Sequence, residues 1–231
     1  MIRWFAIFCF ALLVGCSSSP KKEVTDTGIN QQTEETVKAW KQLIDSGQNW
    51  SDMRRLKATN DFVNQFTFVD DIDHWQQEDY WATPLQTLVT RGGDCEDFSI
   101  AKYFTLTSMG MDEDKLRLTY VKALSLNQAH MVVSYYDNPK VTPLVLDNLN
   151  TQILPATQRD DLYPVYSFNG KGLWLNKKQQ SDQFVDSSER ISLWQKLLKS
   201  MDVEAANESA MICLYQYYDL TDSEARTRCP D

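Results

Sequence analysis

The chain has 231 residues, 32 acidic against 23 basic side chains, a net charge of −9 and a hydrophobic content of 42%. These values exclude wholesale disorder, and the acidic balance argues against nucleic-acid binding, which needs basic residues to displace counterions from phosphates. The same balance suits a protein that binds cations or a basic partner. With only five cysteines and two histidines, each of these residues can be weighed by itself.

The N-terminus has the features of a targeting signal. Arg3 supplies a positive charge, and the apolar run over 4–14 is too short to span a bilayer as a helix. The run ends in Leu13-Val14-Gly15-Cys16, which resembles a bacterial lipobox. The alternative is an ordinary secretory signal cleaved nearby, with an incidental cysteine.

We therefore expect residues 1–15 to be a lipoprotein signal peptide, Cys16 to be lipidated, and residues 16–34 to form a flexible lipidated tether. Ser17 after the cysteine resembles lipoproteins of the outer membrane. The mature protein would then work in the periplasm, anchored to the outer membrane by its lipid, in a compartment where disulfides persist.

The first half of the remaining chain is predicted to be helical. Apolar residues recur at helical spacing over 35–46 and 52–65, whereas 67–90, rich in acids and tryptophan, reads as an ordered loop. After Gly92-Gly93, Asp94 can cap a helix that begins at Cys95 and that Gly110 ends.

The second half changes character. Short β-rich runs separated by turn residues are predicted to be strands, and an amphipathic helix follows over 191–201. The runs cover 116–123, 130–136, 143–149 and 163–168. Helices followed by strands predict an α+β fold with an antiparallel sheet, over a domain spanning 35–201. A C-terminal tail over 202–231 contains Cys213 and Cys229.

Three residues form a candidate thiol-nucleophile site. Cys95 opens a helix, where unpaired backbone N–H groups and the helix dipole stabilise a thiolate. His130 begins an apolar strand and can exchange a proton with the thiol and the leaving group, while Asp147, near the end of the next strand, can orient the imidazole. The backbone N–H of Cys95 can also stabilise an oxyanion.

Each of these residues also has an ordinary interpretation. A lone cysteine is usually a small buried side chain, a strand histidine is usually a hydrogen-bonded core residue, and Asp147-Asn148 is typical of a turn. A zinc site is a sharper rival, but the sequence lacks paired ligand spacings. His74 follows three nearby acids and is expected to be a loop residue without a catalytic role.

The acids beside Cys95 pose an electrostatic problem, because Asp94, Glu96 and Asp97 all flank it. At ~7 Å and an effective dielectric constant of ~20, each carboxylate would oppose a thiolate by on the order of 2 kcal/mol. Either Asp94 and Asp97 form a capping pair with Glu96 in solvent, or a divalent cation neutralises the acids. Oxygen ligands outside the cytoplasm point to calcium.

The stretch from Phe68 to Leu175 resembles the bacterial transglutaminase-like cysteine proteinases of the periplasmic LapG type. The matching blocks begin with Val69-Asp70-Asp71-Ile72-Asp73-His74-Trp75, Glu78-Asp79-Tyr80-Trp81-Ala82-Thr83-Pro84, Gly93-Asp94-Cys95-Glu96-Asp97-Phe98 and Ile100-Ala101-Lys102-Tyr103. They continue with Leu116-Arg117-Leu118-Thr119-Tyr120-Val121, Ala129-His130-Met131-Val132, Leu144-Val145-Leu146-Asp147-Asn148-Leu149 and Pro164-Val165-Tyr166-Ser167-Phe168-Asn169.

The resemblance implies a papain-like transglutaminase core with Cys95, His130 and Asp147 as the triad. It also implies a calcium site that includes Asp94 and Glu96, which favours the cation over the capping pair. The implied activity is limited proteolysis of a large cell-surface adhesin near its N-terminus, at a dialanine site, which releases cells from biofilm. An inner-membrane cyclic di-GMP receptor of the LapD type is the implied inhibitory partner.

Two features depart from the family. The lipobox predicts a membrane anchor where the family is mostly soluble, and the anchor would limit reach to an inner-membrane receptor. The tail has no counterpart in the family, and Cys213 and Cys229 can pair in an oxidising compartment. Two other functions stay open: transglutamination or amide hydrolysis on the same triad, and a non-catalytic module that binds an adhesin or receptor.

Overall fold

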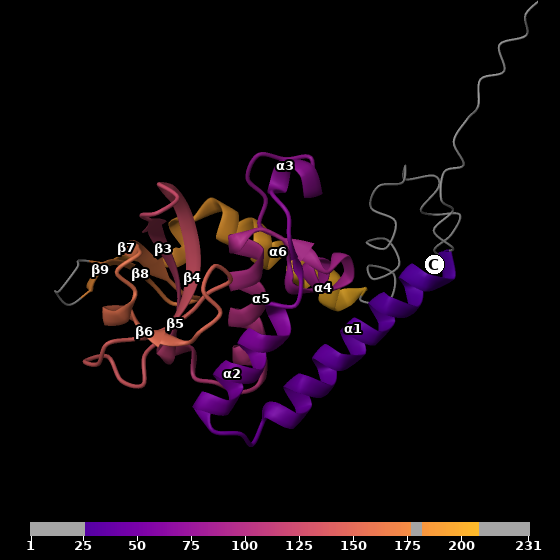
Figure 1. Cartoon of the computed structure of the whole chain (residues 1–231), viewed down its shortest axis with the longest axis horizontal. Helices are drawn as coiled ribbons and strands as arrows, with labels where there is room; N and C mark the ends of the chain where they lie inside the picture. The colour runs from indigo at the N-terminus through magenta and orange to yellow at the C-terminus, as the bar shows by residue number, and fades with distance from the viewer. Residues whose placement is uncertain (1–25, 177–181, 208–231) are drawn as a thin grey trace, which may run out of the picture.

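The computed structural model describes residues 26–176 and 182–207, and within them helices pack against one side of a curved antiparallel sheet (Figure 1). The helices are α1 (Asp26–Gly47), α2 (Asp52–Val63), α3 (Asp71–His74), α4 (Pro84–Thr90), α5 (Cys95–Ser108) and α6 (Ser192–Ala206), with 3-10 turns at η1 (Glu113–Lys115), η2 (Ala156–Gln158) and η3 (Ser188–Arg190). None of the helices in these ranges is long and apolar enough to cross a membrane.

The main sheet has seven strands in the order β6-β5-β4-β3-β7-β8-β9, and every neighbouring pair is antiparallel. The strands are β3 (Leu116–Ala123), β4 (Gln128–Tyr135), β5 (Leu144–Leu146), β6 (Leu154–Pro155), β7 (Leu162–Phe168), β8 (Leu173–Leu175) and β9 (Gln183–Asp186). The predicted α+β class with an antiparallel sheet is confirmed, and β3 has the bounds that the sequence predicted.

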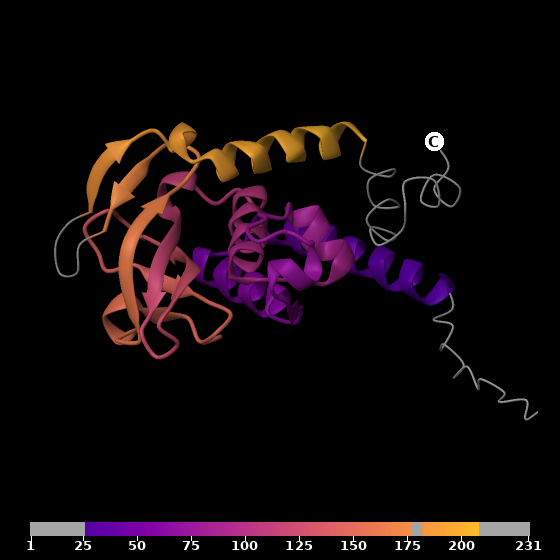
Figure 2. The same cartoon turned by 90° about the horizontal axis from the view of Figure 1, so that it is seen from above.

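The core explains why α5 is rigidly placed. Its residues Ile100 and Tyr103 pack with sheet residues such as Met131, whereas Phe98 and Ala101 belong to a second cluster that includes side chains of α1, α2 and α4. Buried on two sides, α5 lies between the sheet and the other helices (Figure 1). Figure 2 shows α6 beginning beside the sheet and running along one side of the helical layer.

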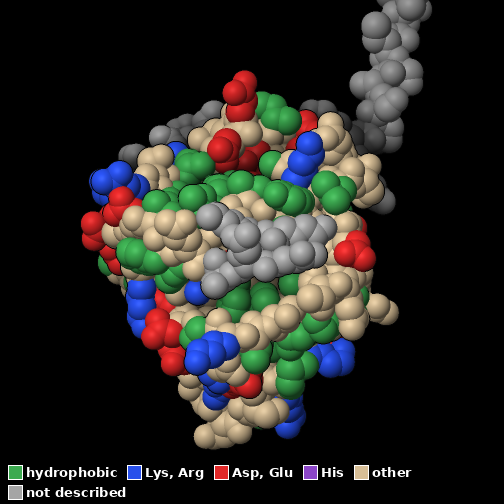
Figure 3. All heavy atoms as spheres, turned by 90° about the vertical axis from the view of Figure 1, so that its left-hand side faces the viewer, with side chains coloured by type: hydrophobic (Ala, Val, Ile, Leu, Met, Phe, Trp, Pro, Cys, Tyr) green, Lys and Arg blue, Asp and Glu red, His purple; other side chains and the backbone are tan. Residues whose placement is uncertain are grey.

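The opposite side of the sheet is less completely covered. Figure 3 looks at this side and shows hydrophobic side chains spread between groups of both charge signs. Strands β7, β8 and β9 contribute exposed large apolar residues: Tyr163, Val165, Leu175, Phe184 and Val185.

The segment 67–90, predicted to be a loop, contains more structure than expected. It begins with β1 (Thr67–Phe68), which pairs in parallel with β2 (Gly92–Gly93), and it includes α3 and α4. Thr83 and Gln86 form a reciprocal capping box at the start of α4, and Pro84 occupies its first turn. These local signals define a helix too short for its apolar period to be recognised.

The predicted element ends also shift. Helix α1 begins at Asp26, so residues 26–34 of the predicted flexible tether are helical. Helix α6 continues to Ala206, so 202–206 belong to this helix and not to a separate tail. The predicted signal peptide, the lipidation of Cys16 and the pairing of Cys213 with Cys229 lie outside the described residues.

Candidate active site

The candidate nucleophile lies at the first residue of α5, as predicted. The Asp94 carboxylate caps the helix by accepting hydrogen bonds from the backbone N–H groups of Glu96 (3.0 Å) and Asp97 (3.4 Å). Gly93 has φ +151°, and a Cβ at this position would collide with the Asp97 side chain. Gly93 therefore lets the backbone pass close to the Asp97 side chain in the first turn of α5.

The Cys95 thiol is half-buried, and its proton goes to a carboxylate rather than to the histidine. Its Sγ donates to Glu96 Oε2 at 2.7 Å, and the backbone N–H of Met131, the residue after His130, faces the sulfur. Burial, followed by the charges of Glu96 and Asp94, raises the pKa of the Cys95 thiol far above its ordinary value. Among the described residues, no lysine or arginine forms an ion pair with Glu96, whose carboxylate accepts the hydrogen bond from the thiol.

His130 and Asp147 meet as predicted. His130 lies in β4 opposite Val121 of β3, and Asp147 follows the last residue of β5. His130 Nε2 is 2.7 Å from Asp147 Oδ1, and both side chains are buried. Burial alone would raise the pKa of Asp147, but hydrogen bonds and charge from His130 and Arg159 hold it well below its ordinary value.

Helix α5 is fixed to the strand that carries His130. One turn after Cys95, Ser99 Oγ donates to the Met131 carbonyl at 2.9 Å, and both groups are buried. The structure thus joins His130 to Asp147 directly and brings the thiol to the backbone beside His130. No direct hydrogen bond joins Cys95 and His130 within the described chain, which differs from the predicted thiol–imidazole contact.

The acids near Cys95 form two overlapping groups of candidate metal ligands. In each group the ligand atoms lie within 4.8 Å of one another: Asp94, Cys95 and Glu96 in one, and Asp71, Asp94 and Asp97 in the other. The predicted pair Asp94 and Glu96 is therefore present in the first group. Asp71, on α3, was not predicted to be a ligand.

The second group carries more negative charge than its surroundings compensate. Burial raises the pKa of Asp71 to about 6, of Asp94 to about 9 and of Asp97 to about 8, and the neighbouring carboxylates add to each shift. Asp71 Oδ1 is buried and has no hydrogen-bond partner among the described residues. These residues fit a hard divalent cation, because it prefers several carboxylate oxygens and would satisfy the unpartnered one.

The capping-pair alternative does not describe this site. Asp94 does cap α5, but Asp97 accepts from the backbone of Ala82 (2.8 Å) and from Trp75 Nε1 (3.2 Å). Glu96 is held by the Cys95 thiol and by the Tyr120 hydroxyl, which donates at 3.0 Å. The contacts of Asp97 hold the loop before α4 against the start of α5.

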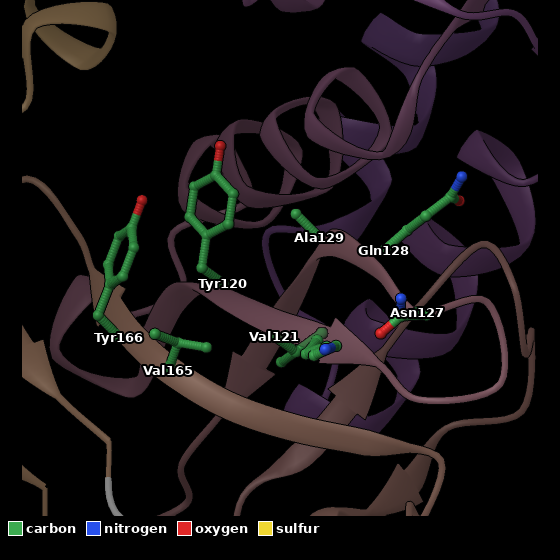
Figure 4. Close-up of a pocket in the computed structure, with 8 residues that line it drawn as sticks. Tyr120, Val121, Asn127, Gln128, Ala129, Val165 and Tyr166 are labelled. Carbon is green, nitrogen blue, oxygen red and sulfur yellow. The ribbon is translucent and has the colours of Figure 1, made fainter.

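A shallow pocket lies beside this site, at the end of β3, β4 and β7 (Figure 4). Tyr120 and Tyr166 stand side by side in it, with ring centroids 4.8 Å apart and hydroxyls pointing the same way (Figure 4). The pocket also includes Ala129, which precedes His130, and Tyr120, which contacts Glu96. The lining is mainly apolar, with Lys122, Asn127 and Gln128 as its charged and polar members.

The structure adds residues that sequence analysis missed, and it places His74 apart from the catalytic candidates. Arg159 contacts Asp147, and Asp71 joins the acidic group. The signals for Asp71 in the sequence were the run of acids before His74 and the family block that contains it. His74 is buried, with Nε2 2.9 Å from Thr90 Oγ1, and it belongs to neither group of candidate ligands.

This arrangement of a helix-start cysteine, a strand histidine and a buried aspartate is typical of papain-like thiol hydrolases. The family model for the bacterial transglutaminase-like cysteine proteinases (BTLCP) matches residues 16–181. The chain therefore belongs to this family and is a transglutaminase-like cysteine protease with a papain-like fold.

Within the family, the chain is similar to LapG of Legionella pneumophila. The EGTA-treated structure of that protein matches at 42% identity with a TM-score of 0.67, and the calcium-bound structure at 44% with a TM-score of 0.66. Each match covers 76% of this chain and 96% of LapG. No curated protein matches this chain in sequence.

Proposed function

We propose that this protein is a calcium-dependent cysteine endopeptidase whose triad is Cys95, His130 and Asp147. The observation that carries the proposal is the buried 2.7 Å contact of His130 with Asp147, beside a cysteine that opens a helix. In the neutral imidazole, the contact with Asp147 places the proton on Nε2 and leaves Nδ1 as the base for the thiol. Asp147 also stabilises the imidazolium that forms.

In cleavage of the peptide bond, Cys95 acts as nucleophile and His130 as the group that accepts and donates the proton. The Cys95 sulfur attacks the carbonyl carbon of the scissile bond, and His130 takes up the thiol proton. The backbone N–H of Cys95, at the start of α5, stabilises the developing oxyanion. His130 then gives its proton to the leaving amine as the C–N bond breaks, and water hydrolyses the thioester to return the thiol.

Calcium would be held by Asp94 and Glu96, with Asp71 as an additional ligand from α3. The relative LapG has been solved with calcium and after treatment with EGTA, which supports this choice of ion. Bound there, the cation supplies positive charge that offsets the carboxylates around the thiol. With Glu96 engaged by the cation, its carboxylate would be a poorer acceptor for the Cys95 proton.

As substrate we propose the N-terminal region of a large cell-surface adhesin, cut at a dialanine site, so that cleavage releases the adhesin and promotes biofilm dispersal. The mainly apolar pocket beside Tyr120 and Ala129 suits the small side chains of such a site. The proposed location is the periplasm, with Cys16 lipidated and anchored in the outer membrane. An inner-membrane cyclic di-GMP receptor of the LapD type is the proposed inhibitory partner.

The proposal is tested with a fluorogenic dialanine peptide and the purified adhesin fragment, using the mature chain. Wild type should cut both, and Cys95→Ala should lower kcat/KM by more than about 1,000-fold while the melting temperature stays unchanged. EGTA should stop cleavage, and calcium but not magnesium should restore it. Full activity in Cys95→Ala would overturn the mechanism, and indifference to chelation would overturn the calcium requirement.

Mass spectrometry of the products distinguishes the alternatives on the same triad. Two shorter chains that sum to the substrate plus water indicate hydrolysis, whereas cross-linked chains with loss of ammonia indicate transglutamination. Absence of both products, together with a Cys95 thiol that does not react with iodoacetamide in calcium, would indicate a non-catalytic binding module.

A further inference from the structure

The second oxygen of the Asp147 carboxylate has a dedicated partner. Oδ1 contacts His130 Nε2 (2.7 Å) and accepts from the backbone N–H of Leu149 (3.0 Å), whereas Oδ2 accepts from Arg159 Nη2 at 2.6 Å. The side chains of Asp147 and Arg159 are 0% and 1% exposed, so water does not compete for this contact. Fixing both oxygens fixes the plane of the carboxylate as well as its position.

Arg159 is itself held in place. It follows the 3-10 turn η2, and its Nε and Nη2 donate to the two oxygens of Asp161 at 2.9 and 2.8 Å. This two-point contact sets the orientation of the planar guanidinium, which a single ammonium charge would not do. Asp161 is half-exposed and lies just before β7. The chain of contacts therefore leads from Asp161 at the surface through Arg159 to the buried Asp147.

The other cation near Asp147 does not share this role. Lys102, two turns after the start of α5, is fully buried and close enough to Asp147 to attract it, but its amine has no hydrogen-bond partner in the described ranges. Lys102 therefore attracts the Asp147 carboxylate but makes no hydrogen bond that would orient it. Arg159 is therefore the side chain that determines how Asp147 faces His130.

We propose that Arg159 is a positioning residue of this protease, which holds Asp147 in the one orientation that sets the His130 imidazole for proton exchange with the Cys95 thiol. The inference rests on the proposed triad and goes beyond it by adding a fourth, non-reacting member. Arg159 acts only through Asp147. Its loss should therefore reduce kcat and leave KM nearly unchanged, because misplacement of a catalytic group affects the reaction step.

The test compares Arg159→Ala and Arg159→Lys with Arg117→Ala in cleavage of the dialanine peptide by the mature chain in calcium. Arg117 is a matched control, because it is also a largely buried arginine of the sheet region in an ion pair, with Asp182 at 2.7 Å. It lies on β3 opposite Ser134, four residues along that strand from the partner of His130. We expect kcat to fall about 100-fold in Arg159→Ala, about tenfold in Arg159→Lys, and less than twofold in the control.

A spectroscopic readout separates positioning from loss of fold. In the Cys95→Ala background, nitrogen-15 spectra of the two histidines, assigned with His74→Gln, report which nitrogen of His130 carries the proton at alkaline pH. The background protein should show the Nε2–H form alone, and adding Arg159→Ala should give a mixture of both tautomers. If Arg159→Ala does not fold, Asp161→Asn carries the test, with a severalfold loss of kcat and an unchanged melting temperature.

The outcomes separate this inference from the proposed function. Cleavage by Cys95→Ala would overturn the function itself. An inactive Cys95→Ala, together with an Arg159→Ala whose kcat and tautomer match those of the Arg117→Ala control, would leave the function standing and overturn the positioning role. If Arg159→Ala does not fold, unchanged kcat in both Arg159→Lys and Asp161→Asn would have the same meaning.

Discussion

Two parts of the candidate active site contain buried or half-buried carboxylates, and within the described residues only one of them has cationic side chains in contact with its carboxylate. Asp147 contacts His130 and Arg159, with Lys102 nearby. At the start of α5, in contrast, no lysine or arginine of the described chain forms an ion pair with the carboxylates of Asp71, Asp94, Glu96 or Asp97.

The difference appears in the protonation of the two groups. Charge from its partners lowers the pKa of Asp147, whereas burial and mutual repulsion raise the pKa values of Asp71, Asp94 and Asp97. The partners of Asp147 favour its ionised form. Asp71, Asp94 and Asp97 would need a cation from solution to favour theirs. Removing a carboxylate should therefore have opposite effects on the free energy of unfolding in the two places.

The largest expected effect is at the self-compensated carboxylate. Asp147→Asn leaves the buried Arg159 without its counter-charge, and we expect it to lower the free energy of unfolding by about 3–5 kcal/mol. Urea denaturation measures this, with Asp161→Asn as the half-exposed control that should cost less than about 1 kcal/mol. A loss below about 1 kcal/mol for Asp147→Asn would remove the contrast on which the comparison depends.

The next effect is the pH dependence of the calcium-free protein. Because the folded pKa values of the acidic group are raised above 3.8, to about 6 to 9, its stabilising contribution is complete below pH 4 and is lost as pH rises through this range. The lowered pKa of Asp147 acts oppositely, and its contribution is lost only in acid. We expect the melting temperature to fall by about 5 °C between pH 5 and pH 9.

Calcium should flatten this dependence, because it favours the ionised acids and displaces their protons. Differential scanning calorimetry with EGTA or with calcium makes the comparison directly. A melting temperature of the EGTA-treated protein that rises steadily from pH 5 to pH 9 would contradict the assignment of raised pKa values to the acidic group.

A smaller effect is expected from a single substitution in the acidic group. Asp71→Asn removes one charge but keeps an oxygen for the backbone N–H of Tyr80, which donates to Asp71 Oδ2 at 2.6 Å. We expect the calcium-free protein to gain on the order of 1–2 kcal/mol at pH 8, because a buried carboxylate no longer has to ionise. Calorimetric titration should show calcium binding weakened at least about tenfold, and unchanged affinity would exclude Asp71 as a ligand.

The smallest effect is expected at Lys102, the second cation near Asp147. Burial lowers the pKa of Lys102 from 10.5 to about 7. The buried amine therefore destabilises the folded protein at any pH below 10.5, and most strongly below pH 7. Lys102→Met should therefore stabilise the protein by about 1 kcal/mol at pH 6, with a smaller gain at pH 9. Urea denaturation at the two pH values measures the difference, and a destabilised variant at pH 6 would show that Asp147 needs this charge.

The sequence predicted those parts of the site whose signals are local. Asp94 and the two glycines indicated where α5 begins, and the apolar run around His130 indicated its strand. The bounds of β3 were also predictable, because its apolar and β-branched residues stand between clear turn signals. Local chemistry was therefore sufficient to nominate Cys95 and His130.

The parts that sequence analysis missed depend on contacts between distant segments. Arg159 follows a 3-10 turn and carries no motif, and its role is visible only because the chain returns to Asp147. Asp71 likewise reaches Asp94 across 23 positions of chain. The two-residue strands β1 and β2 are too short for periodicity, so their parallel pairing could not be predicted.

The pairing of β1 with β2 has a consequence for the kinetics of unfolding. It closes the base of the segment that carries Asp71, with Thr67 opposite Gly92 and Phe68 opposite Gly93. The oxygens of Asp71 and Asp94 come together only when this long loop is closed, so we expect an ion between them to bind late in folding. Such an ion would slow unfolding much more than it would speed folding, because the loop could open only after the ion had been released.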